Sequence, residues 1–168
     1  MSKFMQRAVV GAAIAAFAIS AGAAQAAPVT ASATAKAKIL KQITVTKTVD
    51  LDFGTIVAGS AASTVAISTG SVRTCGAGLT CTGTVTAANF DIGGSNNAVV
   101  TVTGDNTVAL ANGTGGTMSA TLTRSAATLT LTNAAVGGSF QVGGTLSLGA
   151  NQADGAYTGT FNVTVDYQ

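Results

Sequence analysis

Two cysteines are the residues whose type and spacing best suit chemistry. Cys75 and Cys81 are separated by five residues, Gly-Ala-Gly-Leu-Thr. This spacing fits neither the Cys-x-x-Cys pattern of redox proteins nor a zinc-ligand pattern, and the chain has no His to complete a zinc site. In an oxidising compartment the expected product is a disulfide between Cys75 and Cys81. Closing so short a loop stabilises the fold by about 2 kcal/mol at most.

The other polar side chains form no catalytic pattern. Without His there is no Ser-His-Asp or Cys-His pair, and without Glu a carboxylate pair would have to use scattered Asp residues. Asp50 and Asp52 share the polar face of an expected strand, while Asp105 and Asp154 lie in turn contexts. The Gly-rich stretches match no phosphate-binding or calcium-binding loop. The sequence therefore predicts a protein that is not an enzyme, with no cofactor and no metal.

The first 26 residues have the pattern of a Sec-type signal peptide. Lys3 and Arg7 form a positive region, and the uncharged apolar run from Ala8 to Ile19 follows. Ala24-Gln25-Ala26 is a small-x-small cleavage site, so we expect a mature chain of residues 27–168. The apolar run is short for a transmembrane helix, and no second run of membrane length follows. The chain is thus expected to pass through the periplasm to the cell surface or the medium, without a transmembrane anchor.

Removal of the expected signal peptide would leave a mature chain with no formal net charge. Lys3 and Arg7 are two of the eight basic residues of the whole chain, which leaves six basic against six acidic. No basic stripe with interleaved aromatic residues remains, so we expect no nucleic-acid partner. Four of the six remaining basic residues lie close to the mature N-terminus, at Lys36, Lys38, Lys41 and Lys47. This asymmetry fits either a solvated face or the orientation of head-to-tail contacts.

The mature chain has the composition of an all-β protein. Gly, Ala, Thr, Val and Ser dominate, and Thr and Val alternate between Gly-rich and Asn-rich turns. The amount of chain suits one immunoglobulin-like β-sandwich over residues 39–168, preceded by an extended segment at 27–38. Strands are expected at 43–53, 56–57, 64–68, 82–92, 99–103, 107–110, 118–123, 128–132, 140–148 and 157–167. Gly54 is expected to break the phase of the first of these, as a bulge or bend does.

The last residues of the chain alternate strictly between apolar and polar side chains. Tyr157, Gly159, Phe161, Val163, Val165 and Tyr167 have one parity, while Thr and other polar residues have the other. Successive side chains of a strand point to opposite faces, so the pattern predicts one buried face and one solvated face. A C-terminal core strand of any β-sandwich would have the same pattern.

Three segments together resemble a known family. They are residues 51–59 (Leu-Asp-Phe-Gly-Thr-Ile-Val-Ala-Gly), residues 142–153 and residues 157–161. They are similar to the exported proteobacterial domain-of-unknown-function 4402 family, whose members resemble fimbrial subunits and spore-coat-U-like proteins. The penultimate Tyr167, with Gly155 about fourteen residues from the end, also resembles the ending of pilins of the chaperone–usher route. The cysteines depart from that pattern, because many pilins join two early strands by a more distant pair.

This resemblance implies a pilin-like sandwich that polymerises by donor-strand complementation. An extended segment of one subunit fills an incomplete sheet of its neighbour. Donor candidates alternate at Val29, Ala31, Ala33, Ala35 and Ala37, and by resemblance the acceptor candidates are Phe161, Val163, Val165 and Tyr167. The implied partners are further copies or other fimbrial subunits, together with a periplasmic chaperone and an outer-membrane usher. The alternative is a self-sufficient, monomeric adhesion or binding module.

Overall fold

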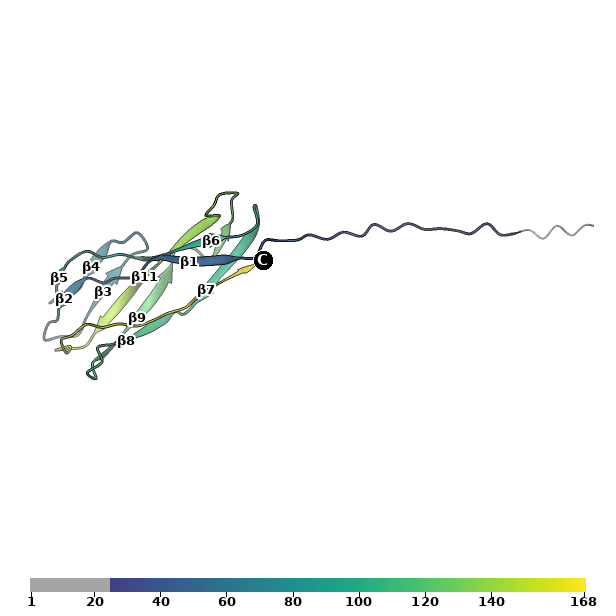
Figure 1. Cartoon of the computed structure of the whole chain (residues 1–168). Helices are drawn as coiled ribbons and strands as arrows, with labels where there is room; N and C mark the ends of the chain where they lie inside the picture. Colours follow the sequence, from purple (N-terminus) through teal and green to yellow (C-terminus); the bar gives the residue numbers. More distant parts are fainter. Residues whose placement is uncertain (1–24) are drawn as a thin grey trace, which may run out of the picture. The chain divides into compact units, whose positions relative to one another are not determined.

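The computed structural model describes residues 25–168, which fall into two compact units that divide between Ala37 and Lys38. In the first unit, residues 25–37 form no strand and are fully exposed to solvent. The second unit, Lys38–Gln168, contains all the strands (Figure 1). Most of the expected signal peptide, residues 1–24, lies outside the described residues.

The described chain contains strands and no helix, which confirms the all-β class. The strands are β1 (Thr44–Val49), β2 (Thr55–Val57), β3 (Ser63–Ile67), β4 (Arg73–Cys75), β5 (Thr80–Thr82), β6 (Ala88–Gly93), β7 (Val99–Gly104), β8 (Thr107–Ala111), β9 (Thr117–Arg124), β10 (Thr128–Thr130), β11 (Gly138–Leu148) and β12 (Val163–Tyr167). All the strand pairs are antiparallel.

The long strand β11 organises a seven-stranded sheet. Val142 pairs with Ala88 of β6 and with Arg124 of β9, so β6 and β9 lie on opposite edges of β11. Residues 144–147 pair with both β3 and β9, so β3 follows β6 along the same edge. Beyond β6 lies β1, beyond β3 lies β4, and beyond β9 lies β8. One strand therefore holds together elements that span most of the sequence.

A second, three-stranded sheet has the order β10-β7-β12 and completes the sandwich. The hydrophobic core joins side chains of both sheets, among them Phe140 and Ile92 from the large sheet and Val100 from the small one. Phe140 is paired with Phe90 on the neighbouring strand, and their rings stack with centroids 5.2 Å apart. Burying each such side chain contributes about 1.5–3 kcal/mol.

A small β2–β5 ribbon lies outside both sheets, and a disulfide links it to β4 of the large sheet. Cys75 ends β4 and Cys81 lies in β5, and the two form a disulfide with Cα atoms 6.1 Å apart. The disulfide expected from the sequence is thus present. Since Ile56 of β2 pairs with Cys81, the cross-linked loop also supports β2.

Several expected strands are shorter or divided. The expected strand at 82–92 is shortened to β6, because Gly83 adopts a φ of 76° directly after β5 and residues 83–87 form only an isolated bridge, between Thr86 and Asp52. The terminal strand begins only at Val163, and before it Thr158 forms a single bridge with Ala111. Strand β4 was not expected, because it is only three residues long and has no apolar alternation.

Candidate functional site

The terminal strand β12 has the buried and solvated faces that its sequence predicts. Val165 and Tyr167 pair with Val102 and Val100 of β7, both of which are buried in the core. Val165 is only 8% exposed, whereas Thr164 is fully on the solvent side. The four acceptor candidates Phe161, Val163, Val165 and Tyr167 therefore all belong to the inward-facing parity, and all pack against the core.

Strand β1 is an edge strand whose inward face stays partly open. It pairs only with β6, with Val45 opposite Ile92 and Lys47 opposite Phe90. Directly paired residues lie on the same face of a sheet, so Val45 points to the core side. Nevertheless, 38% of Val45 is exposed, because no strand covers this edge among the described residues.

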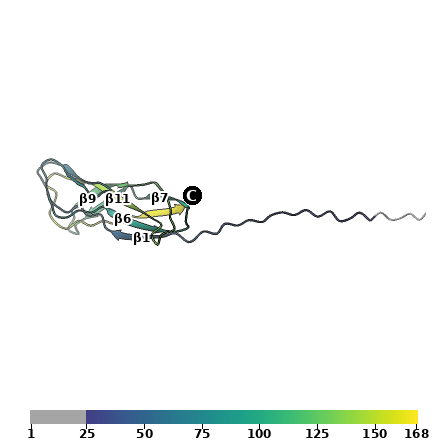
Figure 2. The ribbon, with the colours of Figure 1, turned by 90° about the horizontal axis from the view of Figure 1, so that it is seen from above.

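Strands β1 and β12 border the same side of the sandwich without pairing. Figure 2 shows the two strands running in opposite directions. At one end, the Tyr167 hydroxyl donates a hydrogen bond to the Lys41 carbonyl oxygen at 2.7 Å and accepts one from the Ser95 N–H at 2.8 Å. Farther along, the Phe161 ring meets the edge of Phe90, with centroids 6.3 Å apart. We call this side, between residues 41–58 and residues 152–167, the open side.

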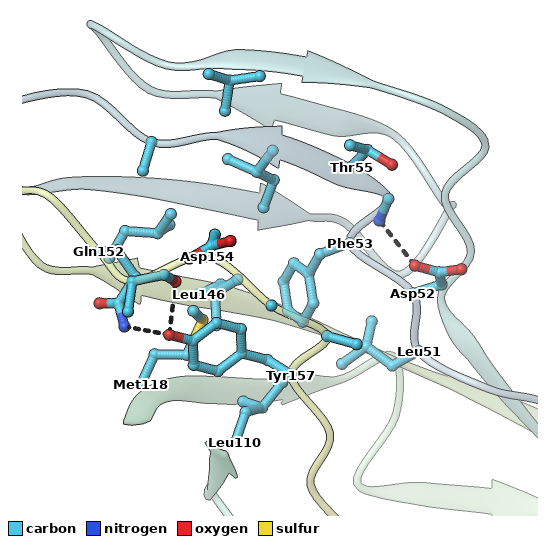
Figure 3. A pocket seen from close by; sticks show the side chains of 18 residues that line it. Leu51, Asp52, Phe53, Thr55, Leu110, Met118, Leu146, Gln152, Asp154 and Tyr157 are labelled. Atoms are coloured by element: carbon cyan, nitrogen blue, oxygen red, sulfur yellow. Dashed lines mark hydrogen bonds between the residues drawn. The ribbon is translucent and has the colours of Figure 1, made fainter. Parts of the chain in front are cut away.

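At the other end, the open side widens into an apolar pocket of about 700 Å³ (Figure 3). Its walls come from the segment 51–58, from the loop 152–157 and from the strands β8, β9 and β11 between them. The apolar lining includes Leu51, Phe53, Ile56, Leu110, Met118, Leu146, Leu148 and Tyr157. At one end of the open side, Tyr167 bridges its two borders through hydrogen bonds, and we call this the closed end. The pocket lies at the other end.

Hydrogen bonds hold the loop wall of the pocket in place. The Tyr157 hydroxyl donates to the Ala153 carbonyl oxygen at 2.8 Å and accepts from the Gln152 side-chain amide at 2.9 Å. The same Gln152 amide donates to the Thr117 carbonyl oxygen. The Asn112 amide donates to the Asp154 carbonyl oxygen. These bonds fix the loop against β9 and the turn that precedes it.

The opposite wall depends on a turn at Gly54. Gly54 has a φ of 76°, and a Cβ there would lie 2.7 Å from both the Arg73 guanidinium and the Thr82 carbonyl oxygen. The Asp52 carboxylate accepts a hydrogen bond from the Gly54 N–H at 2.8 Å. This turn places Phe53 in the core and Ile56 in the pocket wall, where the disulfide-linked β5 supports it.

The pocket combines apolar side chains with two carboxylates. Its lining is largely apolar, and its carboxylates, Asp52 and Asp154, are both exposed. Among residues 25–168, no group of three or more His, Cys, Asp or Glu side chains could hold a metal ion. Within the same range no helix is long and apolar enough to cross a membrane.

The sequence predicted the C-terminal border of the open side, but it did not predict the pocket. Three of the four acceptor candidates lie in β12 of the second unit, and Phe161 lies just before it. The five donor candidates lie exposed in the first unit. Leu110, Met118 and Leu146 come from three strands that the sequence gives no reason to combine into a pocket. The only local signal was the apolar residues of 51–57 on either side of Gly54.

The comparisons with known proteins identify a family. The model of the family described as "Domain of unknown function (DUF4402)" matches residues 43–167. This range contains all the strands, the disulfide and the pocket. No curated protein and no solved structure matched the chain.

Proposed function

We propose that this chain, which belongs to the DUF4402 family, is an exported, non-enzymatic structural protein that forms a cell-surface filament by donor-strand complementation. The signal peptide expected at residues 1–26 would direct the export. The open side would be the acceptor, and residues 27–37 of another copy would be the donor. A periplasmic chaperone and an outer-membrane usher would be its assembly partners.

The observation that carries the proposal is the open side itself. Within residues 25–168 two adjacent sheet edges are unpaired there, and inward-facing side chains such as Val45 and Val163 stay partly exposed. An unpaired edge beside apolar surface is a template for one more strand. Such a strand would form main-chain hydrogen bonds to β1 and β12 and would bury alternate side chains.

The N-terminal segment fits this space in length and pattern. Residues 27–37 are exposed and form no strand, and their alternate residues from Val29 to Ala37 are apolar. An extended chain rises about 3.3 Å per residue, so residues 27–37 reach about 33 Å. Tyr157 and Tyr167, at the two ends of the open side, are also ten residues apart in the sequence, and the last five residues of this stretch are the extended strand β12.

The test is assembly of the mature chain. Residues 27–168, refolded at increasing concentration, should form a ladder of species that resists SDS and collapses on boiling. A chain that lacks residues 27–37 should fold but stay monomeric. A synthetic peptide of residues 27–40 should raise the thermal stability of this shortened chain, because a ligand that binds only the folded state stabilises it.

The matched control is the same peptide with Ala31 and Ala33 replaced by Asp, which should have no effect because both charges would enter an apolar site. A full-length chain that stays monomeric at every concentration would instead favour a self-sufficient adhesion or binding module. In that module the N-terminal segment would act within its own chain or serve as a leader.

A further inference from the structure

We propose that Ile39 of one copy occupies the apolar pocket of the next copy, and that the donor segment therefore runs antiparallel to β12. Val29 of the same donor would then lie near Tyr167 of the acceptor. This inference rests on the proposed function and deepens it, because it assigns the pocket an occupant and gives the filament a direction.

Ile39 has the right parity, size and exposure for this role. It continues the alternation of Val29, Ala31, Ala33, Ala35 and Ala37, and it is larger than any of them. In its own chain it is 93% exposed, although burying an Ile side chain is worth about 1.5–3 kcal/mol. The pocket has a volume of about 700 Å³, so the Ile39 side chain fills more of it than an Ala side chain would.

The separation of Tyr157 and Tyr167 in the acceptor matches the separation of Ile39 and Val29 in the donor. Val29 and Ile39 are ten residues apart, as are Tyr157 at the pocket and Tyr167 at the closed end. A strand with Ile39 beside Tyr157 therefore brings Val29 beside Tyr167. The opposite orientation would place Val29 in the pocket and Ile39 beside Tyr167. The ten-residue separation therefore fits both orientations of the donor segment and does not choose between them.

The position of Lys41 decides which orientation can build a filament. Lys41 is bonded to Tyr167 and Ser95, so the residues before it join the sandwich at the closed end of its own open side. Ile39 precedes Ile43, which packs against the core, by only four residues, or about 13 Å of extended chain. With Ile39 in a neighbour's pocket, the closed end of one copy must lie against the pocket end of the next. Contacts between two different surfaces build an open filament when the rotation between successive copies does not close a ring.

The opposite orientation of the donor segment gives a closed dimer, which cannot grow into a filament. If Val29 filled the pocket, the donor would enter the acceptor from the closed end, and the closed ends of both copies would meet. Such a contact uses the same surface on both partners, so it gives a reciprocal dimer and no chain growth. The same orientation within a single chain would give a self-complemented monomer. Whether Ile39 or Val29 occupies the pocket thus determines whether the chain forms a filament or a closed dimer or monomer.

The charges around the pocket favour Ile39 over Val29 as the residue that occupies it. Lys38 and Lys41 flank it, whereas no charged residue lies within the six positions that follow Val29. The pocket lining includes the exposed carboxylates Asp52 and Asp154, and the Asp154 carboxylate forms no hydrogen bond or ion pair within residues 25–168. Charges of opposite sign around an apolar contact increase the association rate and select the orientation.

The test compares two single variants of the chain 27–168. Ile39→Asp and Val29→Asp each place one charge on a fully exposed residue, so neither should disturb the isolated sandwich. Light scattering should show that Ile39→Asp raises the concentration needed for assembly by about 100-fold or more, since a charge would enter the pocket. Val29→Asp should have a much smaller effect, because Val29 would lie at the closed end, outside the pocket.

A mixing experiment checks that Ile39 and the pocket belong to one contact. Ala156→Trp adds a bulky side chain at a residue that lines the pocket, in a chain whose donor segment is intact, and circular dichroism verifies that it folds. Neither Ala156→Trp nor Ile39→Asp should polymerise alone, but a mixture should form a one-to-one heterodimer and nothing larger. The reversed charges in Lys38→Asp and Asp154→Lys should each slow assembly, and combining them on facing copies should restore the rate at low salt.

The outcomes separate this inference from the proposed function. A wild-type ladder that is abolished by Val29→Asp and unaffected by Ile39→Asp would overturn the inference and leave the filament standing. A ladder unaffected by both variants, or a mixture that forms no heterodimer, would also overturn the inference. A wild-type chain that forms only monomers or closed dimers would overturn both the inference and the filament.

Discussion

The hydroxyl of Tyr167 donates a hydrogen bond to the carbonyl oxygen of Lys41, and so joins two residues that are 126 positions apart. Ser95 completes the arrangement, because its N–H donates to the same hydroxyl and its Oγ accepts from the Lys41 N–H. The first and last segments of the folded unit are thereby fixed to one another at one end, while the open side between them has no strand pairing.

Tyr167→Phe tests the strength of this closure. The ring keeps its packing, but the Lys41 carbonyl and the Ser95 N–H both lose their partner. We expect the free energy of unfolding to fall by about 1–2 kcal/mol, as urea denaturation would measure it. The matched control is Asp166→Asn on the exposed face of β12, which should change the stability little. Equal effects of the two substitutions would contradict a role for the hydroxyl.

Val165→Asp and Thr164→Asp test the two faces of β12. Val165 is buried against β7, and an unpaired charge there costs several kcal/mol, so we expect an unfolded or aggregated chain. Thr164, one residue away, points to solvent, and its substitution should leave the fold intact. Circular dichroism and thermal unfolding of the two purified variants would show the difference, and equal tolerance of both would refute the alternating faces.

Replacing both Cys75 and Cys81 with Ser tests the cross-link. We expect the sandwich to fold with a loss of about 2 kcal/mol at most, because the disulfide closes a short loop and Cys81 is only partly buried against the core. The larger effect should be local, since β5 supports β2 in the pocket wall. Hydrogen exchange at Thr55–Val57 should accelerate more than exchange in β7. Intact mass after alkylation without reductant should show no modified thiol in the wild-type chain, and two modified thiols would mean that the disulfide is absent.

Gly54→Ala and Gly78→Ala form a matched pair. Both glycines have a φ near 75°, so each substitution carries a backbone strain of about 1–2 kcal/mol. Only at Gly54 would the new Cβ also clash, with the Arg73 guanidinium and the Thr82 carbonyl oxygen, whereas nothing lies within 4 Å at Gly78. Gly54→Ala should therefore lower the unfolding temperature more than Gly78→Ala. Similar unfolding temperatures would show that the close approach at Gly54 is relieved at no cost.

The sequence determined the features that depend on local rules. Period-two alternation placed Val163, Val165 and Tyr167 on one face, because the direction of a strand side chain depends only on its parity. The short separation of Cys75 and Cys81 made their pairing predictable for a similar reason. Gly54 was recognised as a break because an apolar alternation changes phase there, and its positive φ agrees with that. The all-β class followed from composition and period alone.

Only the tertiary structure decided which elements meet. Pairing Val142 with both Ala88 and Arg124, or bringing Leu110, Met118 and Leu146 into one pocket, depends on contacts between distant strands. Many strands of this chain have similar Thr-rich and Val-rich sequences, so alternation does not specify partners. The open side is likewise a property of the assembled sandwich. It exists because β1 and β12 border the same side and do not pair, and neither strand carries that information in its own residues.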